Sequence, residues 1–516
     1  YYIDIYRELT DSADITTLTV MSLKNLEAFY HWLKAEFAAC RKVVIEALDL
    51  ASATGIHIIS PFILANGIAG ALSCSDLVTA EKFLQNMKPY VKTPGGWIRE
   101  YFHLLTAWHA LLEKKFSKAV LHGKLAVKYA KETGSPLSAT TSHLGLALAL
   151  NAAGRPKNAE QQLKMAFSIC RRIGSEQMEF ACYLAAAEFA IDSEVRNRTR
   201  LSLQKAMSIG CTQQYFNTWF WRQDKMARLC CKALEAKIEE DYVQDLICKR
   251  GLLPEEPPLE LENWPWPLKI YTLGRFALVK DGKVVSFPKK GQEKPLSLLK
   301  AIISLGGRDV SQTRISDFLW PDADGDIAHG TFKTTLHRLR KLLGHYGAIQ
   351  VNSGRIALDQ RYCWVDAWVF ERLLSKADIA WQHAQNDKDS ARAAELTQKA
   401  LDLYKGPIFK SEDNDWILPL REHLHDRFMQ AVNWLGCHWQ NTGDWAKAID
   451  IYQAGLAIDD LSEVCYRGLM RCNQKLGRIS AALSVYKKCE KILGAVSGIP
   501  PSTETQNLKK SLLLNK

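Results

Sequence analysis

The sequence predicts a mainly α-helical protein in which two helical-repeat regions flank a central domain with a small β-sheet. Three observations predict this architecture. Apolar residues recur at helical spacing from residue 1 to about 250 and again after residue 366. A proline-rich stretch follows the first helical region, and the period then switches to short strands within residues 268–365 only.

Residues 1–250 contain an internal period of 40 residues. Ala119 recurs as Ala159 and Gly134 recurs as Gly174, and Ala126 follows the same step. Small residues at fixed positions let paired helices approach closely, and a glycine ends the second helix of each pair. The pattern predicts a tetratricopeptide-like α-solenoid with somewhat long repeats. A plain helical bundle is the alternative.

Residues 251–267 hold five of the 17 prolines of the chain. Proline fixes φ and lacks a backbone N–H donor, so it disfavours both helix and sheet interiors. The stretch therefore predicts a stiff linker and a domain boundary.

Residues 268–365 combine strands with three short helices. The strand pattern LKIYTLGRFALVKDGKVVSF is broken at Gly274 and turns at Asp281-Gly282. We expect three helices and then a hairpin centred on Ser353-Gly354, with the helices at residues 294–305, 311–320 and 326–343. Strands, three helices and a terminal hairpin in about 95 residues predict a winged-helix domain.

Residues 366–516 are predicted to be helical and to carry a second period. Gly443 recurs as Gly477 and Ala448 recurs as Ala482, each 34 residues later, and Tyr452 follows the same step. Because 34 residues is the length of a tetratricopeptide repeat, a second tetratricopeptide-like helical domain is expected here.

The positive charge is concentrated in the central domain. The whole chain carries +11, and residues 268–362 hold 16 Lys or Arg against 8 Asp or Glu. A basic segment in an otherwise near-neutral chain indicates a polyanionic partner, most often nucleic acid. The alternative is a solvated basic surface without a partner.

The third helix of the central domain, HGTFKTTLHRLRKLLG, has two chemically different faces. Its apolar side chains fall on one narrow face and are expected to pack inward: Phe332, Leu336, Leu339 and Leu343. The opposite face carries Lys333, Thr334, His337, Arg338 and Lys341, and Arg340 flanks it. These groups donate to phosphate oxygens and to base edges in a major groove, so we predict that this helix reads double-stranded DNA. A solvated basic face is again the alternative.

Four further basic residues are candidates for contacts to the DNA backbone. Arg355 lies at the tip of the predicted hairpin, where a wing meets the duplex, or it is an ordinary turn arginine. Lys289, Lys290 and Lys294 lie near the start of the first helix, from which they could reach phosphate oxygens.

Several other classes of protein lack support in the sequence. The 13 cysteines are scattered without a CxxC pair, which favours reduced thiols in a cytoplasmic protein over a disulfide or zinc framework. No apolar run of about 18 residues predicts a membrane span. No P-loop, HExxH or GxSxG motif occurs, so we expect neither an enzyme nor a bound cofactor or metal.

Two weaker patterns have simpler interpretations. Asp322, Asp324 and Asp326 resemble the start of a calcium loop, but Ile327 stands where that loop needs glycine. The first region holds aromatic residues that could line a ligand groove, although core packing is the preferred interpretation: Trp97, Trp108, Tyr215, Phe216, Trp219 and Trp221.

The central and C-terminal regions resemble bacterial transcription activators of the antibiotic-regulatory-protein type. In that family an OmpR-type winged helix precedes a bacterial transcriptional activation domain. The matching segments are residues 273–276 (LGRF), 317–322 (DFLWPD), 336–344 (LHRLRKLLG), 364–366 (WVD), 404–407 (YKGP) and 501–505 (PSTET).

The resemblance implies sequence-specific DNA binding by the third helix on direct repeats, with dimer formation on DNA. It also implies recruitment of RNA polymerase by the loop at residues 320–329. The loop carries Asp322, Asp324 and Asp326, which suit an exposed contact surface, although Asp326 could simply cap the third helix.

The N-terminal region is similar to the sensor arrays of large signal-transducing ATPase regulators. The similarity implies that a small-molecule or protein signal binds the repeats. Two alternatives remain open at this stage. The chain could be a protein–protein interaction scaffold, or it could be the regulatory C-terminal part of an ATPase, since it does not begin with Met.

Overall fold

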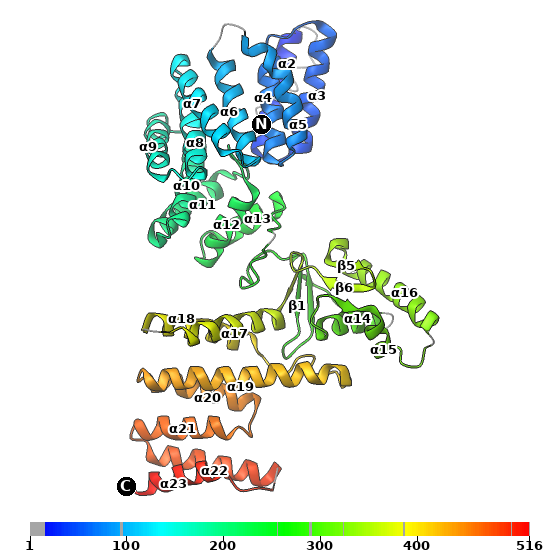
Figure 1. Ribbon diagram of the computed structural model, residues 1–516, viewed down its shortest axis with the longest axis vertical. Coiled ribbons are helices and arrows are strands. Elements are labelled where there is room, and N and C mark those ends of the chain that lie inside the picture. The colour runs from blue at the N-terminus through cyan, green and yellow to red at the C-terminus, as the bar shows by residue number, and fades with distance from the viewer. Residues whose placement is uncertain are drawn as a thin grey trace. The chain divides into compact units, whose positions relative to one another are not determined.

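The computed structural model describes residues 16–92, 96–254, 256–287, 292–323, 325–384, 387–496 and 498–514 (Figure 1). The chain forms two compact units, Tyr1–Trp264 and Pro265–Lys516. The boundary between them in the sequence falls within the proline-rich stretch 251–267. The described residues contain 22 α-helices and seven short strands, and all of the strands lie in the second unit. The prediction of a mainly α-helical protein is confirmed.

The first unit consists of consecutive antiparallel helices (Figure 1). Its α-helices are α2 (Thr17–Leu33), α3 (Phe37–Thr54), α4 (Ser60–Ser73), α5 (Leu77–Met87), α6 (Gly96–Leu112), α7 (Phe116–Thr133), α8 (Pro136–Ala152), α9 (Pro156–Ile173), α10 (Glu176–Asp192), α11 (Arg196–Gln213), α12 (Gln223–Glu235) and α13 (Glu240–Arg250). A short 3-10 helix, η1 (Lys88–Lys92), follows α5.

The 40-residue period corresponds to helix pairs of constant length. The helices α6, α8 and α10 each have 17 residues, and α7, α9 and α11 each have 18. Ala119 and Ala159 are fully buried where paired helices meet. Gly134 and Gly174 end α7 and α9 with φ of +68° and +64°, a left-handed conformation that glycine adopts without steric cost.

The helices α6, α8 and α10 pack against one another as well as against their pair partners, so they form the inner layer of this part of the array. The helices α7, α9 and α11 form its outer layer. The composition follows the layering: α8 contains no charged residue, and its 17 residues include 12 that are buried.

The segment 215–222 covers the inner layer. Its Phe220 ring lies so close to Gly145 of α8 that a Cβ there would stand 2.2 Å from the ring. Its Asn217 amide donates to the Trp32 carbonyl of α2 at 2.9 Å, and Trp108 of α6 donates to the Trp221 carbonyl. Of the six aromatic residues considered for a ligand groove, four are buried, which confirms the core interpretation for Trp108, Phe216, Trp219 and Trp221, while Trp97 and Tyr215 are half-buried.

The second unit opens with two small sheets and three helices. The strands are β1 (Leu268–Tyr271), β2 (Ala277–Lys280), β3 (Lys283–Val284), β4 (Val310–Ser311), β5 (Ile349–Asn352), β6 (Arg355–Leu358) and β7 (Cys363–Val365). The helices are α14 (Glu293–Ser304), α15 (Gln312–Leu319) and α16 (Gly325–Leu343), and η2 (Tyr346–Ala348) follows α16. One sheet has the order β3-β2-β1-β7, and the other has the order β4-β6-β5.

Helices complete the second unit. They are α17 (Asp366–Gln382), α18 (Asp387–Leu403), η3 (Asp415–Ile417), α19 (Leu418–Asn441), α20 (Trp445–Ile458), α21 (Glu463–Lys475), α22 (Ile479–Val496) and α23 (Thr503–Leu514). The 34-residue period falls on equivalent sites, because Ala448 and Ala482 are both fully buried and Tyr452 and Tyr486 are both nearly so.

A buried carboxylate joins the small sheet to the helices that follow it. Asp366, at the start of α17, accepts hydrogen bonds from the backbone N–H groups of Thr272, Leu273 and Ala367 and from the Thr272 hydroxyl, at 2.6–3.0 Å. Burial raises the pKa of Asp366, and the hydrogen bonds oppose that rise. The small sheet and the C-terminal helices therefore share a polar junction inside one unit.

Candidate nucleic-acid interface

The apolar face of α16 holds that helix against the rest of the central domain. Phe332, Leu339 and Leu343 are buried, as is Leu336, and α16 packs against α14. The predicted packing of these four side chains is confirmed. Since each buried side chain of this size contributes about 1.5–3 kcal/mol, this stripe fixes which side of α16 faces solvent.

The opposite face of α16 presents a set of exposed polar and charged side chains. The exposed residues are Lys333, Thr334, His337, Arg338 and Lys341. None of them makes an ion pair with any residue that the structure describes. Thr334 donates its hydroxyl hydrogen to the Gly330 carbonyl at 3.0 Å, which leaves its oxygen free to accept. The face combines cationic donors with one acceptor.

Arg340 differs from its neighbours on α16. It is half-buried, and its Nη2 donates to the Ile349 carbonyl of β5 at 3.1 Å. Its Nε is buried and has no hydrogen-bond partner among the described residues. Arg340 therefore lies against the hairpin of its own domain, whereas we predicted that it flanks the exposed face.

Arg355 begins β6 directly after the hairpin turn. The turn residues Ser353 and Gly354 have φ of +49° and +74°, which suits a tight two-residue hairpin. The Arg355 guanidinium is exposed, and its Nη1 donates to the Asp309 carbonyl at 3.1 Å and lies 3.6 Å from the Asp309 carboxylate. The charge of Arg355 is thus partly balanced by that of Asp309.

The remaining predicted residues lie around this face. Lys294 is exposed in the first turn of α14, while Lys289 and Lys290 lie outside the described residues. In the loop before α16, Asp322 is exposed and Asp324 lies outside the described residues. Asp326 is exposed in the first turn of α16, where a carboxylate interacts favourably with the helix dipole.

A contact that local sequence patterns do not predict links α15 to α16. The Gln312 side chain of α15 hydrogen-bonds to the His329 Nδ1 of α16 at 2.6 Å. The Gln312 backbone N–H also donates to the Gly354 carbonyl in the hairpin turn. The sequence gives only the position of Gln312 near the start of the predicted helix 311–320, because the two contacts join residues 17 and 42 positions apart.

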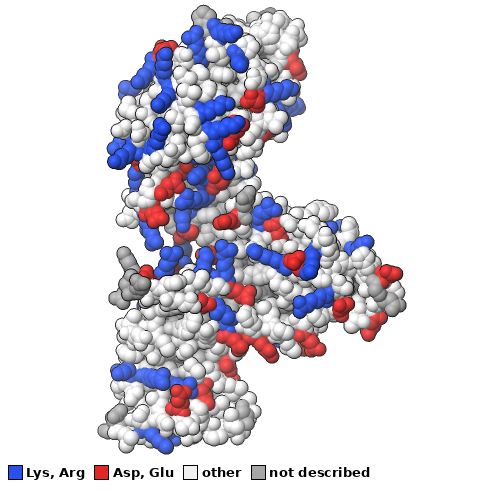
Figure 2. Space-filling view, viewed as in Figure 1, with Lys and Arg blue, Asp and Glu red and all other residues white. Residues whose placement is uncertain are grey.

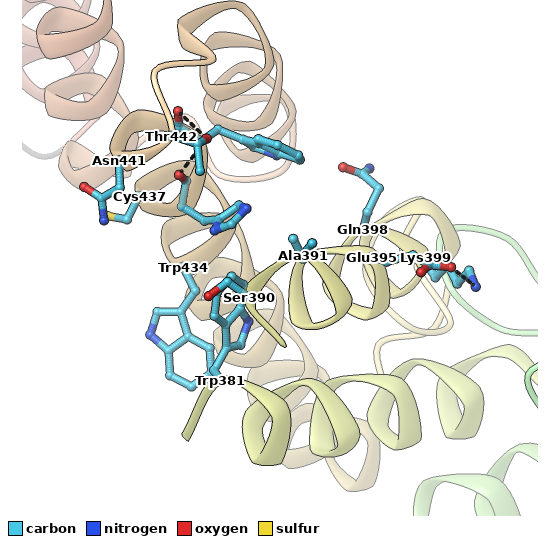
Figure 3. Close-up of a pocket in the computed structure, with 13 residues that line it drawn as sticks. Trp381, Ser390, Ala391, Glu395, Gln398, Lys399, Trp434, Cys437, Asn441 and Thr442 are labelled. Atoms are coloured by element: carbon cyan, nitrogen blue, oxygen red, sulfur yellow. Dashed lines mark hydrogen bonds and ion pairs between the residues drawn. The ribbon is translucent and has the colours of Figure 1, made fainter. Parts of the chain in front are cut away.

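A separate groove of about 980 Å³ lies between α17, α18 and α19 (Figure 3). Trp381, Trp434 and Trp439 line it, together with polar residues such as Gln398 and Asn441. Figure 3 shows Trp381 and Trp434 at the same end of the groove. No local sequence pattern marks these residues, because they come from three helices.

Other features bear on the class of protein. The 13 cysteines are all free thiols. Among the described residues, no three His, Cys, Asp or Glu side chains are grouped so that they could hold a metal ion. Within the same residues, no helix combines the length and the apolar character that crossing a bilayer requires.

Comparison with known proteins gives two sequence matches. Residues 365–513 match the family model of the bacterial transcriptional activator domain. Regulatory protein AfsR of Streptomyces griseus is 27% identical over 275 residues, which cover 51% of this chain and 26% of that protein. The chain therefore matches about a quarter of the length of this relative. These similarities support a transcriptional activator as the class of protein.

Two solved structures show a looser likeness. EmbR of Mycobacterium tuberculosis, in complex with a low-affinity phosphopeptide, has a TM-score of 0.40 and 20% identity over 48% of this chain and 66% of that chain. The apo form of RapI has a TM-score of 0.35 and 9% identity over 89% of this chain and 99% of that chain. At these scores the likeness carries no functional information.

Proposed function

We propose that the protein is a transcription activator that binds specific double-stranded DNA by inserting α16 into the major groove. The exposed face of α16 is the observation that supports it most. That face carries Lys333, His337, Arg338 and Lys341, none of them ion-paired with a described residue, while the other face is fixed in the core. An α-helix about 10–12 Å across fits the major groove, which is about 12 Å wide.

The proposed contacts divide into two kinds. Arg338 and His337 lie in the middle of the exposed face and would reach base edges, which carry sequence information. Lys333, Lys341 and Lys294 would contact phosphates, which position the helix without reading sequence. Arg355 would contact the backbone beside the wing, and Arg340 would act by bracing β5 rather than by touching DNA.

Recruitment of RNA polymerase is assigned to the loop before α16. Asp322 is exposed in this loop and Asp326 is exposed in the first turn of α16, so both present negative charge beside the proposed DNA-reading face. Binding to direct repeats as a head-to-tail dimer and regulation by a signal received on the helical repeats complete the proposal. Both derive from the family resemblance.

Selection of bound sites from a pool of random duplexes tests the proposal directly. The expected result is a single enriched motif present as a direct repeat. A parallel selection with the Arg338→Ala variant should fail to enrich the same motif. Recovery of unrelated sequences by the parent protein, or of the same motif by the variant, would contradict sequence reading by α16.

A further inference from the structure

The outer layer of the N-terminal array carries a strong and one-sided charge. The helices α7, α9 and α11 contain 12 Lys or Arg and only two acidic residues, Glu132 and Glu160. The inner helices α6, α8 and α10 contain one basic and five acidic residues. The charge is thus segregated by layer, although residues 1–264 as a whole are nearly neutral.

All 12 of these basic side chains are exposed. Two of them pair with acids, Arg171 with Glu179 at 3.9 Å and Arg198 with Glu160 at 2.7 Å. The other ten make no ion pair within the described parts of the chain: Lys118, Lys124, Lys128, Lys131, Lys157, Lys164, Arg172, Arg196, Arg200 and Lys205. We call these ten residues the outer basic face. Figure 2 shows Lys and Arg outnumbering acidic residues on the visible surface of this unit.

Fold stability does not account for this arrangement. Lys124 and Lys128 are four residues apart on α7, and Arg196 and Arg200 are four apart on α11. Like charges at this spacing destabilise a helix by about 0.2–0.5 kcal/mol per pair. A surface that served only solubility would intersperse both signs.

The inner layer offers no comparable surface to a macromolecular partner. Segment 215–222 already packs against α2, α6 and α8, and its Arg222 forms an ion pair with the buried Glu188 of α10. Binding on the inner side would require this segment to leave. The outer layer is therefore the side on which the array presents free charge.

We infer that the outer basic face is a second, sequence-independent contact surface for the phosphate backbone of duplex DNA. Seven of its ten cations are lysines, which protein–protein interfaces disfavour but phosphate contacts use readily. The cations also spread over three helices of the outer layer, which suits an extended polyanion. The choice of DNA over another polyanion rests on the proposed function, because a DNA-bound α16 would keep duplex at high local concentration.

Two aromatic rings on these helices lie under cations, while Phe116 at the start of α7 is exposed. Lys128 lies over the Tyr129 ring at 5.7 Å, and Arg171 lies over the Phe167 ring at 5.0 Å.

A charge-matched pair of full-length variants tests the inference. The test variant carries Lys124→Gln, Lys164→Gln, Arg172→Gln and Arg200→Gln. The control variant carries Lys42→Gln, Lys82→Gln, Lys88→Gln and Lys237→Gln, which removes the same charge from exposed positions outside α7, α9 and α11. Glutamine preserves helix formation, and circular dichroism should show equal helicity for both variants.

Affinity for a random-sequence duplex is measured by fluorescence anisotropy over a range of salt concentrations. If all four positions contact phosphate, the slope of log K against log salt becomes shallower by about 3–4 in the test variant. The affinity at 100 mM salt should fall about tenfold or more, whereas the control variant should stay within about twofold of the parent.

Three outcomes would overturn the inference or narrow it to another partner. Equal losses of DNA affinity in the two variants would mean that the net charge of the protein, and not the outer basic face, determines the affinity. Unchanged affinity in the test variant would remove the outer basic face from DNA binding. Poly-L-glutamate and unlabelled DNA can be compared as competitors at equal total charge. If poly-L-glutamate displaced the labelled duplex as effectively as the DNA did, an acidic protein would be the favoured partner. None of these results depends on operator recognition, which the site selection with Arg338→Ala tests separately.

Discussion

Arg338 and Arg340 lie two residues apart on α16 and yet face different surroundings. Two residues turn a helix by about 200°, so neighbours at this spacing point to opposite sides. Arg338 is exposed, whereas Arg340 reaches the Ile349 carbonyl of the hairpin. Their substitution should therefore separate recognition from stability.

We expect Arg338→Ala to weaken specific DNA binding by about 1–3 kcal/mol, because it removes a donor to base edges. Its free energy of unfolding should change by less than about 0.5 kcal/mol, since the side chain is exposed. Gel-shift titration and denaturant unfolding measure the two quantities. A variant that binds its selected site as tightly as the parent would exclude Arg338 from the interface.

Arg340→Ala provides the matched comparison. Loss of its hydrogen bond leaves the Ile349 carbonyl without that donor, so we expect a loss of about 1–2 kcal/mol in the free energy of unfolding of the second unit. The same two assays apply. Stability equal to that of the parent would mean that Arg340 does not brace β5.

Glu100 of α6 is a second residue whose surroundings set a measurable property. It is fully buried, one oxygen accepts from the Ser142 hydroxyl at 2.9 Å, and the other has no partner among the described residues. Burial raises the pKa of Glu100 to about 7, which the hydrogen bond from the Ser142 hydroxyl only partly opposes. The folded state therefore keeps this proton at pH values where the unfolded chain has lost it.

The sign of the pH effect follows from linkage. Between the unfolded pKa of about 4.3 and the folded pKa, the folded state binds more protons, so the contribution of Glu100 to stability falls as pH rises. Above the folded pKa the contribution stays at its lower value. Glu100→Gln should remove this decline and stabilise the first unit at pH 8 by up to about 3 kcal/mol. If the free energy of unfolding depended on pH in the same way in the parent and in the variant, Glu100 would not be the source of the decline.

At the scale of elements, two glycines let distant segments of the second unit meet. Gly274 follows β1 with φ of +82°, and a Cβ there would lie 2.7 Å from the backbone of Lys405. Gly406 lies against Gly274 from the other side, and the Gly274 N–H donates to the Pro407 carbonyl. The LGRF and YKGP segments therefore form one contact between the small sheet and the C-terminal helices.

Gly274→Ala should lower the free energy of unfolding of the second unit by about 2–4 kcal/mol, because it combines an unfavourable φ with a backbone clash. Gly282→Ala is the control, since its φ is +76° but nothing lies within 4 Å of the added Cβ. In the control variant the free energy of unfolding should fall only by the backbone strain of alanine at a positive φ, about 1–2 kcal/mol. Equal losses in the two variants would show that close approach is not limiting at Gly274.

Most elements could be predicted because their signals are local. The predicted third helix, residues 326–343, begins one residue after the observed start of α16, and the predicted hairpin corresponds to β5 and β6. The parallel pairing of β1 with β7 could not be predicted, because it joins residues about 95 positions apart. The same holds for segment 215–222 on the inner layer and for the direction of the Arg340 side chain, which tertiary packing decides.

The candidate site shows the same division. The helical wheel separated the buried leucines of α16 from its exposed cations, because both follow from a period of 3.6 residues. The pairing of Arg355 with Asp309 and the contact between Gln312 and His329 depend on how three elements meet. Whether the exposed residues bind DNA stays a prediction that the selection experiment tests.

At the scale of the whole molecule, positive charge is concentrated in two regions, which the net charge of the chain does not reveal. The central domain carries a net +8 over residues 268–362, while residues 1–264 are nearly neutral but segregate their cations onto the outer layer. Phosphate contacts release counterions, so the number of contacts sets the salt dependence of binding. Duplex length should therefore reveal how many contact surfaces the protein uses.

On a short duplex that spans only the selected site, about five phosphate contacts would give a slope of log K against log salt near −4 to −5. On a duplex with random flanks, about four further contacts from the outer basic face should steepen the slope to about −8. Anisotropy titrations of the full-length protein on both duplexes measure the difference. Equal slopes would confine DNA contact to the central domain, and a slope near zero on both duplexes would exclude the phosphate backbone as the partner of either surface.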